Sequence, residues 1–181
     1  LLDEWLEDLR ADKEALIDLY NNARAVTPDR DAKLDELRNC IAEKVKQPTN
    51  AGNRKVVVFT AFTDTARYLY DNLRDWAQSE IGVHTALVSG TYTQSTFGRN
   101  DYDSILTNFS PVARNRAGLK QADRTGEIDL LIATDCISEG QNLQDCAVVV
   151  NYDLPWAIIR LIQRAGRVDR IGQMAEEILC Y

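Results

Sequence analysis

The sequence predicts an α/β fold, a parallel sheet flanked by helices, with two further helices in front of it. Apolar, β-branched runs recur without alternating polar residues, which is typical of strands buried on both faces. Stretches with helical periodicity separate these runs. An order of strand, helix and strand favours right-handed crossovers around a parallel sheet.

Helical spacing of apolar residues opens the chain. Residues 3–24 place apolar side chains three or four positions apart, as on one face of a helix. Thr27 and Pro28 predict the start of a second helix, because threonine is a favoured N-cap and proline is favoured in the first helical turn. We expect residues 1–50 to form a helical connector or appendage and residues 51–181 to form the α/β domain.

Strands and helices alternate through the expected α/β domain. The run KVVVFTAF begins it, and the proline after Ser110 marks the end of a helix. Residues 111–126 are polar and basic, and we expect a loop with one helical turn. The expected elements are a strand at 55–62, a helix at 64–78, a strand at 83–89, a helix at 100–109, strands at 129–134 and 146–153, a helix from 155 to about 164, and the start of a strand at 176–181.

Charge and composition argue against several classes of protein. The chain has 181 residues and a net charge of −7, which argues against a strong free-standing nucleic-acid binder. A local basic patch is nevertheless present at 160–170. No apolar run approaches the ~18 residues of a membrane helix, and the acidic N-terminus differs from a secretory signal. We therefore expect a cytoplasmic protein without a membrane partner.

Some features of the chain stay open. Four cysteines without a C-x-x-C pair and a single histidine lack zinc-site spacing, so we expect no metal ligands. The basic loop at 111–126 is either a phosphate contact or a solvated loop. The chain begins without methionine and stops inside the apolar run EEILCY. We expect a piece of a longer protein, with the last domain truncated at its C-terminus.

Two polar segments carry the chemistry. In an open parallel sheet, ligands bind beyond the carboxyl ends of the strands. TDCISEGQNLQ follows the strand at 129–134, and QRAGRVDRIGQ follows the strand at 146–153 and its helix. Arg167 and Arg170 are three apart, so they point the same way on a helix or tight turn. Two converging guanidinium groups suit a phosphate that gains charge, although spacing alone also allows a solvated basic turn.

These segments carry a family resemblance. Q-x-x-G-R-x-x-R followed by I-G-Q resembles motif VI of superfamily 2 helicases, and QRAGRVDRIGQ is most similar to the Swi/Snf-like branch, which includes bacterial ATPases that recycle RNA polymerase. TDCISEGQNLQ resembles motif V, and KVVVFTAFTDTARYL resembles motif IV. The resemblance covers about residues 28–173. It implies the second RecA-like lobe of an ATP-driven helicase or nucleic-acid translocase.

The resemblance also implies roles for individual residues. Arg167 and Arg170 match the motif VI arginines that reach the γ-phosphate of ATP. The residues implied to lie near the nucleotide are Gln163, Gly166, Glu139, Gly140 and Asn142. The residues implied to contact a nucleic-acid backbone are Thr60, Ser89, Gly90, Thr134 and Asp135. Such contacts position a backbone without reading bases, and we expect duplex DNA as the partner.

Half of the expected motor is absent from the sequence. No G-x-x-x-x-G-K-S/T occurs, so the chain lacks a P-loop for the β- and γ-phosphates. The run DELR at 35–38 resembles a D-E-x-x box but lies on an amphipathic helix. ATP and Mg²⁺ are therefore expected to be held mainly by a first RecA-like lobe of the same polypeptide. We expect the isolated chain to be inactive.

Two alternatives remain. The first is a degenerate RecA-like module that binds nucleic acid or acts as a scaffold without an ATPase role. Such a module is expected to have lost Arg167 or Arg170, and both are present. The second is a different nucleotide enzyme on a doubly wound sheet, which requires a glycine-rich loop after the first strand. FTAFTD contains no glycine.

Overall fold

The computed structural model describes residues 2–119, 126–138 and 141–181. It divides into two compact units, Leu1–Leu37 and Arg38–Tyr181, whose boundary falls inside the second helix. In chain order the elements are α1 (Leu2–Arg24), η1 (Pro28–Arg30), α2 (Ala32–Lys46), β1 (Val56–Thr60), α3 (Thr63–Glu80), β2 (His84–Val88), β3 (Thr93–Ser95), α4 (Tyr102–Phe109), η2 (Arg116–Gly118), β4 (Ile128–Thr134), η3 (Asp135–Ser138), β5 (Val148–Asn151), α5 (Ile158–Val168) and β6 (Leu179–Cys180).

Both N-terminal helices are confirmed, but the second begins later than predicted. Thr27 caps only the single 3₁₀ turn of η1, and its side chain makes no capping hydrogen bond. Asp31 caps α2 instead, because its Oδ1 accepts hydrogen bonds from the backbone N–H groups of Lys33 and Leu34, both at 3.0 Å. A carboxylate here satisfies two N–H groups that the first turn leaves without partners. No helix among the described residues has the length and apolarity to cross a bilayer.

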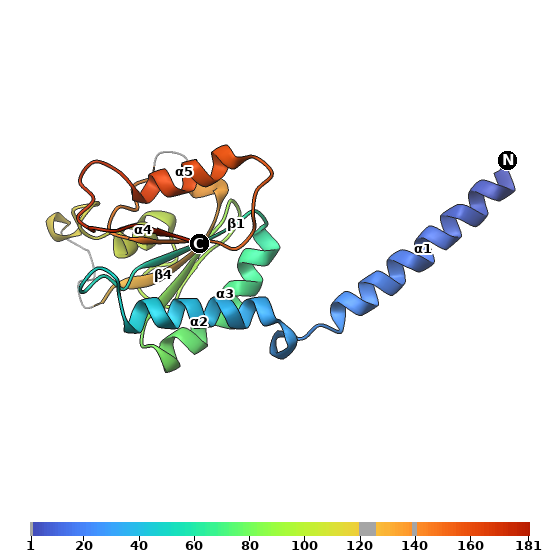
Figure 1. Cartoon of the computed structure of the whole chain (residues 1–181), viewed down its shortest axis with the longest axis horizontal. Helices are drawn as coiled ribbons and strands as arrows, with labels where there is room; N and C mark the ends of the chain where they lie inside the picture. Colours follow the sequence, from blue (N-terminus) through green and yellow to red (C-terminus); the bar gives the residue numbers. More distant parts are fainter. Residues whose placement is uncertain (1, 120–125, 139–140) are drawn as a thin grey trace. The chain divides into compact units, whose positions relative to one another are not determined.

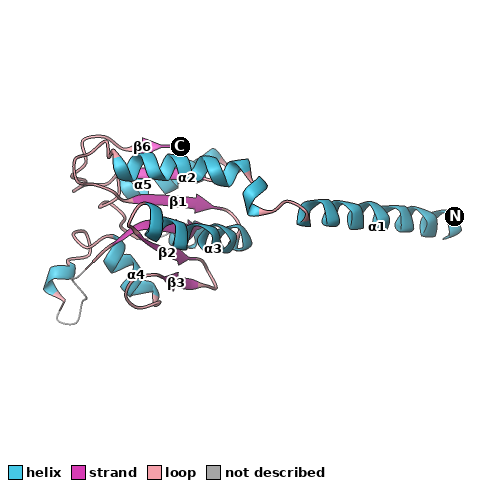
Figure 2. Ribbon diagram, turned by 90° about the horizontal axis from the view of Figure 1, so that it is seen from below, coloured by secondary structure: helices cyan, strands magenta, loops and turns pink. Residues whose placement is uncertain are grey.

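Within the described residues, six strands form one sheet in the order β3-β2-β4-β1-β5-β6 (Figure 2). All neighbouring pairs are parallel except β2 and β3, which are antiparallel. The predicted parallel sheet is therefore confirmed, with one antiparallel edge strand that the sequence did not predict. Thr93–Ser95 is too short and polar to produce a strand pattern.

Helices cover both faces of this sheet. Figure 1 shows α3 on one face and α5 on the other. The face beneath α5 carries a core that includes Phe59, Leu131 and Val149 from the strands, together with Phe109 of α4 and Val168 of α5, all fully buried. The position of α5 on this face follows from a right-handed crossover, because α5 connects the parallel strands β5 and β6 at the edge of the sheet.

The last helix differs from its predicted bounds. It begins at Ile158, after an irregular segment that contains Pro155, and it continues through Gly166 to Val168. The sequence predicts an end near Arg164, two residues before a glycine that weakens a helix. The burial of Val168 in the core explains why the last turn forms.

The basic loop after α4 is partly structural. Arg116 is 8% exposed, and its guanidinium donates hydrogen bonds to the carbonyl oxygen of Gly126 at 2.8 Å and to Asn108 at 3.2 Å. It also forms an ion pair with Glu127 at 3.1 Å. Arg116 is therefore neither a solvated side chain nor available to phosphate, which corrects the sequence interpretation for this residue. Residues 120–125 of the loop lie outside the described residues.

Candidate nucleotide and nucleic-acid site

The parallel register brings several predicted residues together at the carboxyl edge of the sheet. Thr60 ends β1 and Thr134 ends β4, and the two are register partners. Both side chains are buried. The Thr60 hydroxyl donates a hydrogen bond to Asp153 Oδ2, so this hydroxyl already serves the loop after β5. The same carboxylate oxygen accepts the N–H of Ala61 at 3.2 Å.

Ser89 and Gly90 follow β2 at this edge. The Ser89 hydroxyl accepts a hydrogen bond from the backbone N–H of Tyr92 at 2.9 Å. The backbone N–H of Ser89 donates to the Tyr92 carbonyl oxygen at 2.8 Å. Ser89 therefore closes the turn into β3 and is itself buried. Gly90 is exposed, and a Cβ at this position would meet no atom within 4 Å. Of this pair, Gly90 offers the open surface that a phosphate backbone needs.

Asp135 holds α5 against the sheet. Its Oδ1 accepts a hydrogen bond from Arg164 Nε at 2.7 Å, and its Oδ2 accepts one from Arg160 Nη1 at 3.1 Å. The sequence predicted Asp135 to contact a nucleic-acid backbone. The structure instead shows both carboxylate oxygens engaged with arginines of α5, as charge complementarity requires.

Arg164 is a buried residue of this site that the sequence analysis treats only as part of a basic patch. Its side chain is fully buried, with the guanidinium 5.4 Å from the centre of the Phe59 ring. Nη1 donates to Asn151 Oδ1 at 3.1 Å and to the Asp153 carbonyl at 3.3 Å. The sequence feature that indicates its burial is its position four residues before Val168, which is buried. Residues four apart share a helix face.

The predicted motif VI residues lie on the outer side and at the end of α5. Gln163 and Gly166 are exposed, and a Cβ on Gly166 would meet no atom within 4 Å. Close approach within this chain therefore does not explain the glycine. Arg167 is half-buried, and its Nε has no hydrogen-bond partner among the described residues. Arg170 is exposed in the turn beyond the C-cap Asp169.

Topology separates these arginines from the strand ends. Because β6 is parallel to β5, α5 must run back from the carboxyl edge toward the amino edge of the sheet. Gly172 and Gln173, just after Arg170, line a pocket with Lys55, which precedes β1. The structure therefore does not bring Arg170 together with Thr60 and Thr134. The helix α5 connects the two groups.

The motif V segment joins α5 at a second point. The N–H of Leu143 donates a hydrogen bond to the Arg167 carbonyl oxygen at 3.1 Å. Asn142 Oδ1 accepts the N–H of Gln144 at 3.1 Å, which shapes the turn before β5. Glu139 and Gly140, which were predicted to lie near the nucleotide, are outside the described residues.

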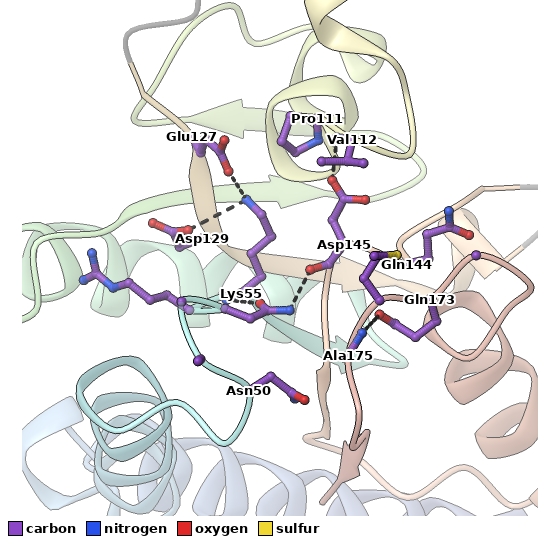
Figure 3. A pocket seen from close by; sticks show the side chains of 16 residues that line it. Asn50, Lys55, Pro111, Val112, Glu127, Asp129, Gln144, Asp145, Gln173 and Ala175 are labelled. Carbon is purple, nitrogen blue, oxygen red and sulfur yellow. Dashed lines mark hydrogen bonds and ion pairs between the residues drawn. The ribbon is translucent and has the colours of Figure 1, made fainter.

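A charged pocket of about 350 Å³ lies at the amino edge of the sheet (Figure 3). Lys55 Nζ pairs with Glu127 at 2.8 Å and Asp129 at 3.8 Å, and donates to the Ile128 carbonyl at 3.0 Å. Burial raises the pKa of Asp129 above its ordinary value of 3.8, and the Lys55 charge opposes this shift. The sequence did not predict this charge cluster.

Gln173 anchors the segment that follows Arg170 beside this pocket. Its Nε2 donates to the carbonyl oxygens of Cys146 at 3.0 Å and Val168 at 2.9 Å. Its Oε1 accepts the N–H of Ala175 at 2.9 Å. The glutamine of the I-G-Q sequence therefore fixes the chain just beyond the motif VI arginines.

Asp129→Asn should raise thermal stability at neutral pH and have no effect in strong acid. Burial favours the protonated carboxyl in the native state. The native state therefore binds a proton more readily than the unfolded chain, and stability falls as pH rises from 3.8 through the native pKa. Above this pH range, the ionised Asp129 carboxylate lowers the stability of the native state by its full desolvation cost. Asparagine removes it, because its side chain does not ionise.

Thermal unfolding of both proteins from acid to neutral pH measures this effect. Asp75→Asn is the matched control, because the Asp75 side chain is 86% exposed. A constant difference in Tm between Asp129→Asn and the parent at every pH would contradict the assignment.

Comparison with known proteins identifies the family. The family described as Helicase conserved C-terminal domain matches residues 32–172. The chain is 34% identical over 119 residues to the uncharacterized ATP-dependent helicase YqhH of Bacillus subtilis, a match that covers 66% of this chain and 17% of that protein. It is 30% identical over 138 residues to the probable ATP-dependent RNA helicase ddx51 of Dictyostelium discoideum, which covers 75% of this chain and 21% of that protein.

The C-terminal part of the Fun30 ATPase domain has the same fold, with a TM-score of 0.56 and 19% identity over 82% of this chain and 39% of that one. The present chain spans about a fifth or less of the curated relatives described above. Its mostly parallel sheet, flanked by helices, is that of a RecA-like helicase lobe. The chain belongs to the family of helicase conserved C-terminal domains.

Proposed function

We propose that this chain is the second motor lobe of an ATP-dependent helicase or nucleic-acid translocase of the Swi/Snf-like branch, acting in the cytoplasm. Arg167 and Arg170 are its arginine fingers, and they reach an ATP site shared with a first RecA-like lobe of the same polypeptide. One observation carries the proposal. The helix α5 is fastened on its inner side by buried Arg164 and leaves Arg170 exposed at its end.

The arginines would act on charge in the transition state. During hydrolysis an in-line water attacks the γ-phosphate, and negative charge spreads over the phosphoryl oxygens. Two guanidinium groups neutralise that charge without changing protonation state. Arg167 is half-buried, and its Nε is itself buried without a partner within the described residues, so it would serve such an oxygen only after the side chain turns outward.

Mg²⁺ and the catalytic acids belong to the first lobe in this proposal. The carboxylates beside α5 are committed to other contacts, because Asp135 pairs with Arg164 and Asp153 accepts the Thr60 hydroxyl. A bound metal would supply charge neutralisation at the β- and γ-phosphates. This lobe contributes arginines, and it contributes the stiff helix that positions them.

The carboxyl edge of the sheet forms the nucleic-acid side. Gly90 is open to solvent at this edge, beside the buried Thr134 that ends β4. Backbone N–H groups and hydroxyls at such an edge contact phosphates without reading bases, so the binding is independent of sequence. We propose duplex DNA as the track. Duplex RNA is the competitor to test, because the relative from Dictyostelium is named an RNA helicase.

The test compares ATP hydrolysis by this chain with that of a longer protein that contains the first lobe. We expect no turnover from the chain alone, because it lacks a P-loop. The longer protein should hydrolyse ATP faster with duplex DNA than with duplex RNA. Activity in neither protein, with both folded, would instead support a degenerate binding module.

A further inference from the structure

An apolar stripe runs the length of α1. The helix has 23 residues, none of them buried, and is about 34 Å long at 1.5 Å per residue. Trp5 and Leu16 are each 66% exposed and Leu9 is 62% exposed. Large apolar side chains along one face of a helix require a partner surface. The stripe consists of Leu2, Trp5, Leu6, Leu9, Leu16, Leu19, Tyr20 and Ala23.

This stripe is symmetric about the midpoint between Asp12 and Lys13. Reversing the direction of the helix about that point places residue n opposite residue 25 − n. Each of the eight stripe positions then meets another stripe position, whereas Ile17, which borders the stripe and is 47% exposed, meets Asp8. The pairs are Leu9 with Leu16, Leu6 with Leu19, Trp5 with Tyr20, and Leu2 with Ala23.

The two central charges follow the same symmetry. Asp12 and Lys13 interrupt the stripe at its midpoint and lie beside a hollow on the helix surface between Leu9 and Leu16. Asp12 and Lys13 form no ion pair with any other residue in the described part of the chain. Under the reversal, Asp12 meets Lys13 and Lys13 meets Asp12.

We propose that α1 is a self-association surface that docks antiparallel on α1 of a second copy of this chain. Isologous contacts of this kind require a self-complementary patch, which the symmetry of the stripe provides. The two reciprocal pairs between Asp12 and Lys13 of the second copy fix the register, while the flanking leucines bury apolar surface. This inference does not depend on the ATPase role.

Charge also selects the antiparallel orientation. Residues 2–12 carry five carboxylates and one arginine, a net charge of −4. Residues 13–24 carry two carboxylates and two basic side chains, a net charge of zero. A parallel pair would place the two acidic halves side by side. The antiparallel pair places each acidic half beside a neutral one, so repulsion is smaller.

Sedimentation equilibrium of the full 181-residue chain tests the proposal. At about 0.1 mM the parent chain should show reversible dimerisation above its 20.4 kDa monomer mass. Asp12→Lys or Lys13→Asp alone should weaken the dimer by about tenfold or more, because two attractive pairs become two repulsive ones. The double variant, Asp12→Lys with Lys13→Asp, should restore it.

Asp18→Lys is the matched control. It makes the same charge change as Asp12→Lys on the opposite face of α1 and should not weaken the dimer. Equal helix content by circular dichroism excludes unfolding as the cause. A monomer at all concentrations would overturn the proposal and leave the stripe to another partner, such as a first lobe. If the parent chain dimerises and the single variants weaken the dimer, but the double variant does not restore it, the antiparallel register is excluded.

Discussion

Replacing Arg170 with alanine in a protein that contains both lobes should lower ATP turnover by more than about tenfold, while ATP affinity falls much less. An arginine that meets developing charge on the γ-phosphate stabilises the transition state more than the bound substrate. The side chain is exposed and beyond the end of α5, so its removal should leave the fold intact. Steady-state hydrolysis at saturating ATP, together with nucleotide binding, separates the two effects.

Arg170→Lys refines the test. Lysine keeps the positive charge but lacks the planar fork of donors, so it should recover only part of the lost turnover. Arg99→Ala, an exposed arginine away from α5, serves as the control for overall charge. Undiminished turnover in Arg170→Ala would remove this residue from the chemistry.

Replacing Asp135 with alanine should destabilise the chain by about 3–5 kcal/mol. The substitution leaves the fully buried Arg164 guanidinium without its counterion. Arginine cannot lose its proton to escape the penalty. Urea unfolding of the parent and the variant measures the loss.

A double-mutant cycle distinguishes this cause from a general packing defect. Asp135→Leu with Arg164→Met removes both charges, and it should cost less than Asp135→Ala alone. If the double variant lost as much stability as Asp135→Ala, or the sum of the losses of the single variants, the pair would not act as a unit. ATP turnover is measured in addition to stability. The proposal predicts that the double variant also loses coupling between nucleic-acid binding and ATP turnover.

Much of the fold follows from local patterns. The run 56–59 is apolar throughout because both faces of the sheet are covered, and this pattern is visible in the sequence alone. The strand at 93–95 is set by pairing with β2, since its own residues are polar. The extension of α5 past Gly166 depends on the burial of Val168, a tertiary effect that helix propensity does not contain.

The candidate site divides in the same way. Thr60 and Thr134 were predictable as neighbours, because parallel strands end at one edge. That rule does not extend to the far end of a crossover helix, where Arg170 lies. Arg164 was hidden because charged residues are rarely buried, and only the fold shows that Asp135 and the Phe59 ring surround it.

The attachment of α5 at both ends has a mechanical consequence. Asp135 fastens the helix near the edge proposed to face nucleic acid, and Leu143 and Gln173 fasten it near the motif VI arginines. A helix of 11 residues is a stiff rod about 16 Å long. Tilting such a rod by about 10° about one end displaces the other by about 3 Å, roughly the length of one hydrogen bond. In the proposed function, a small adjustment at the carboxyl edge would therefore engage or release a contact to phosphate, with the segments of Leu143 and Gln173 moving together with the helix.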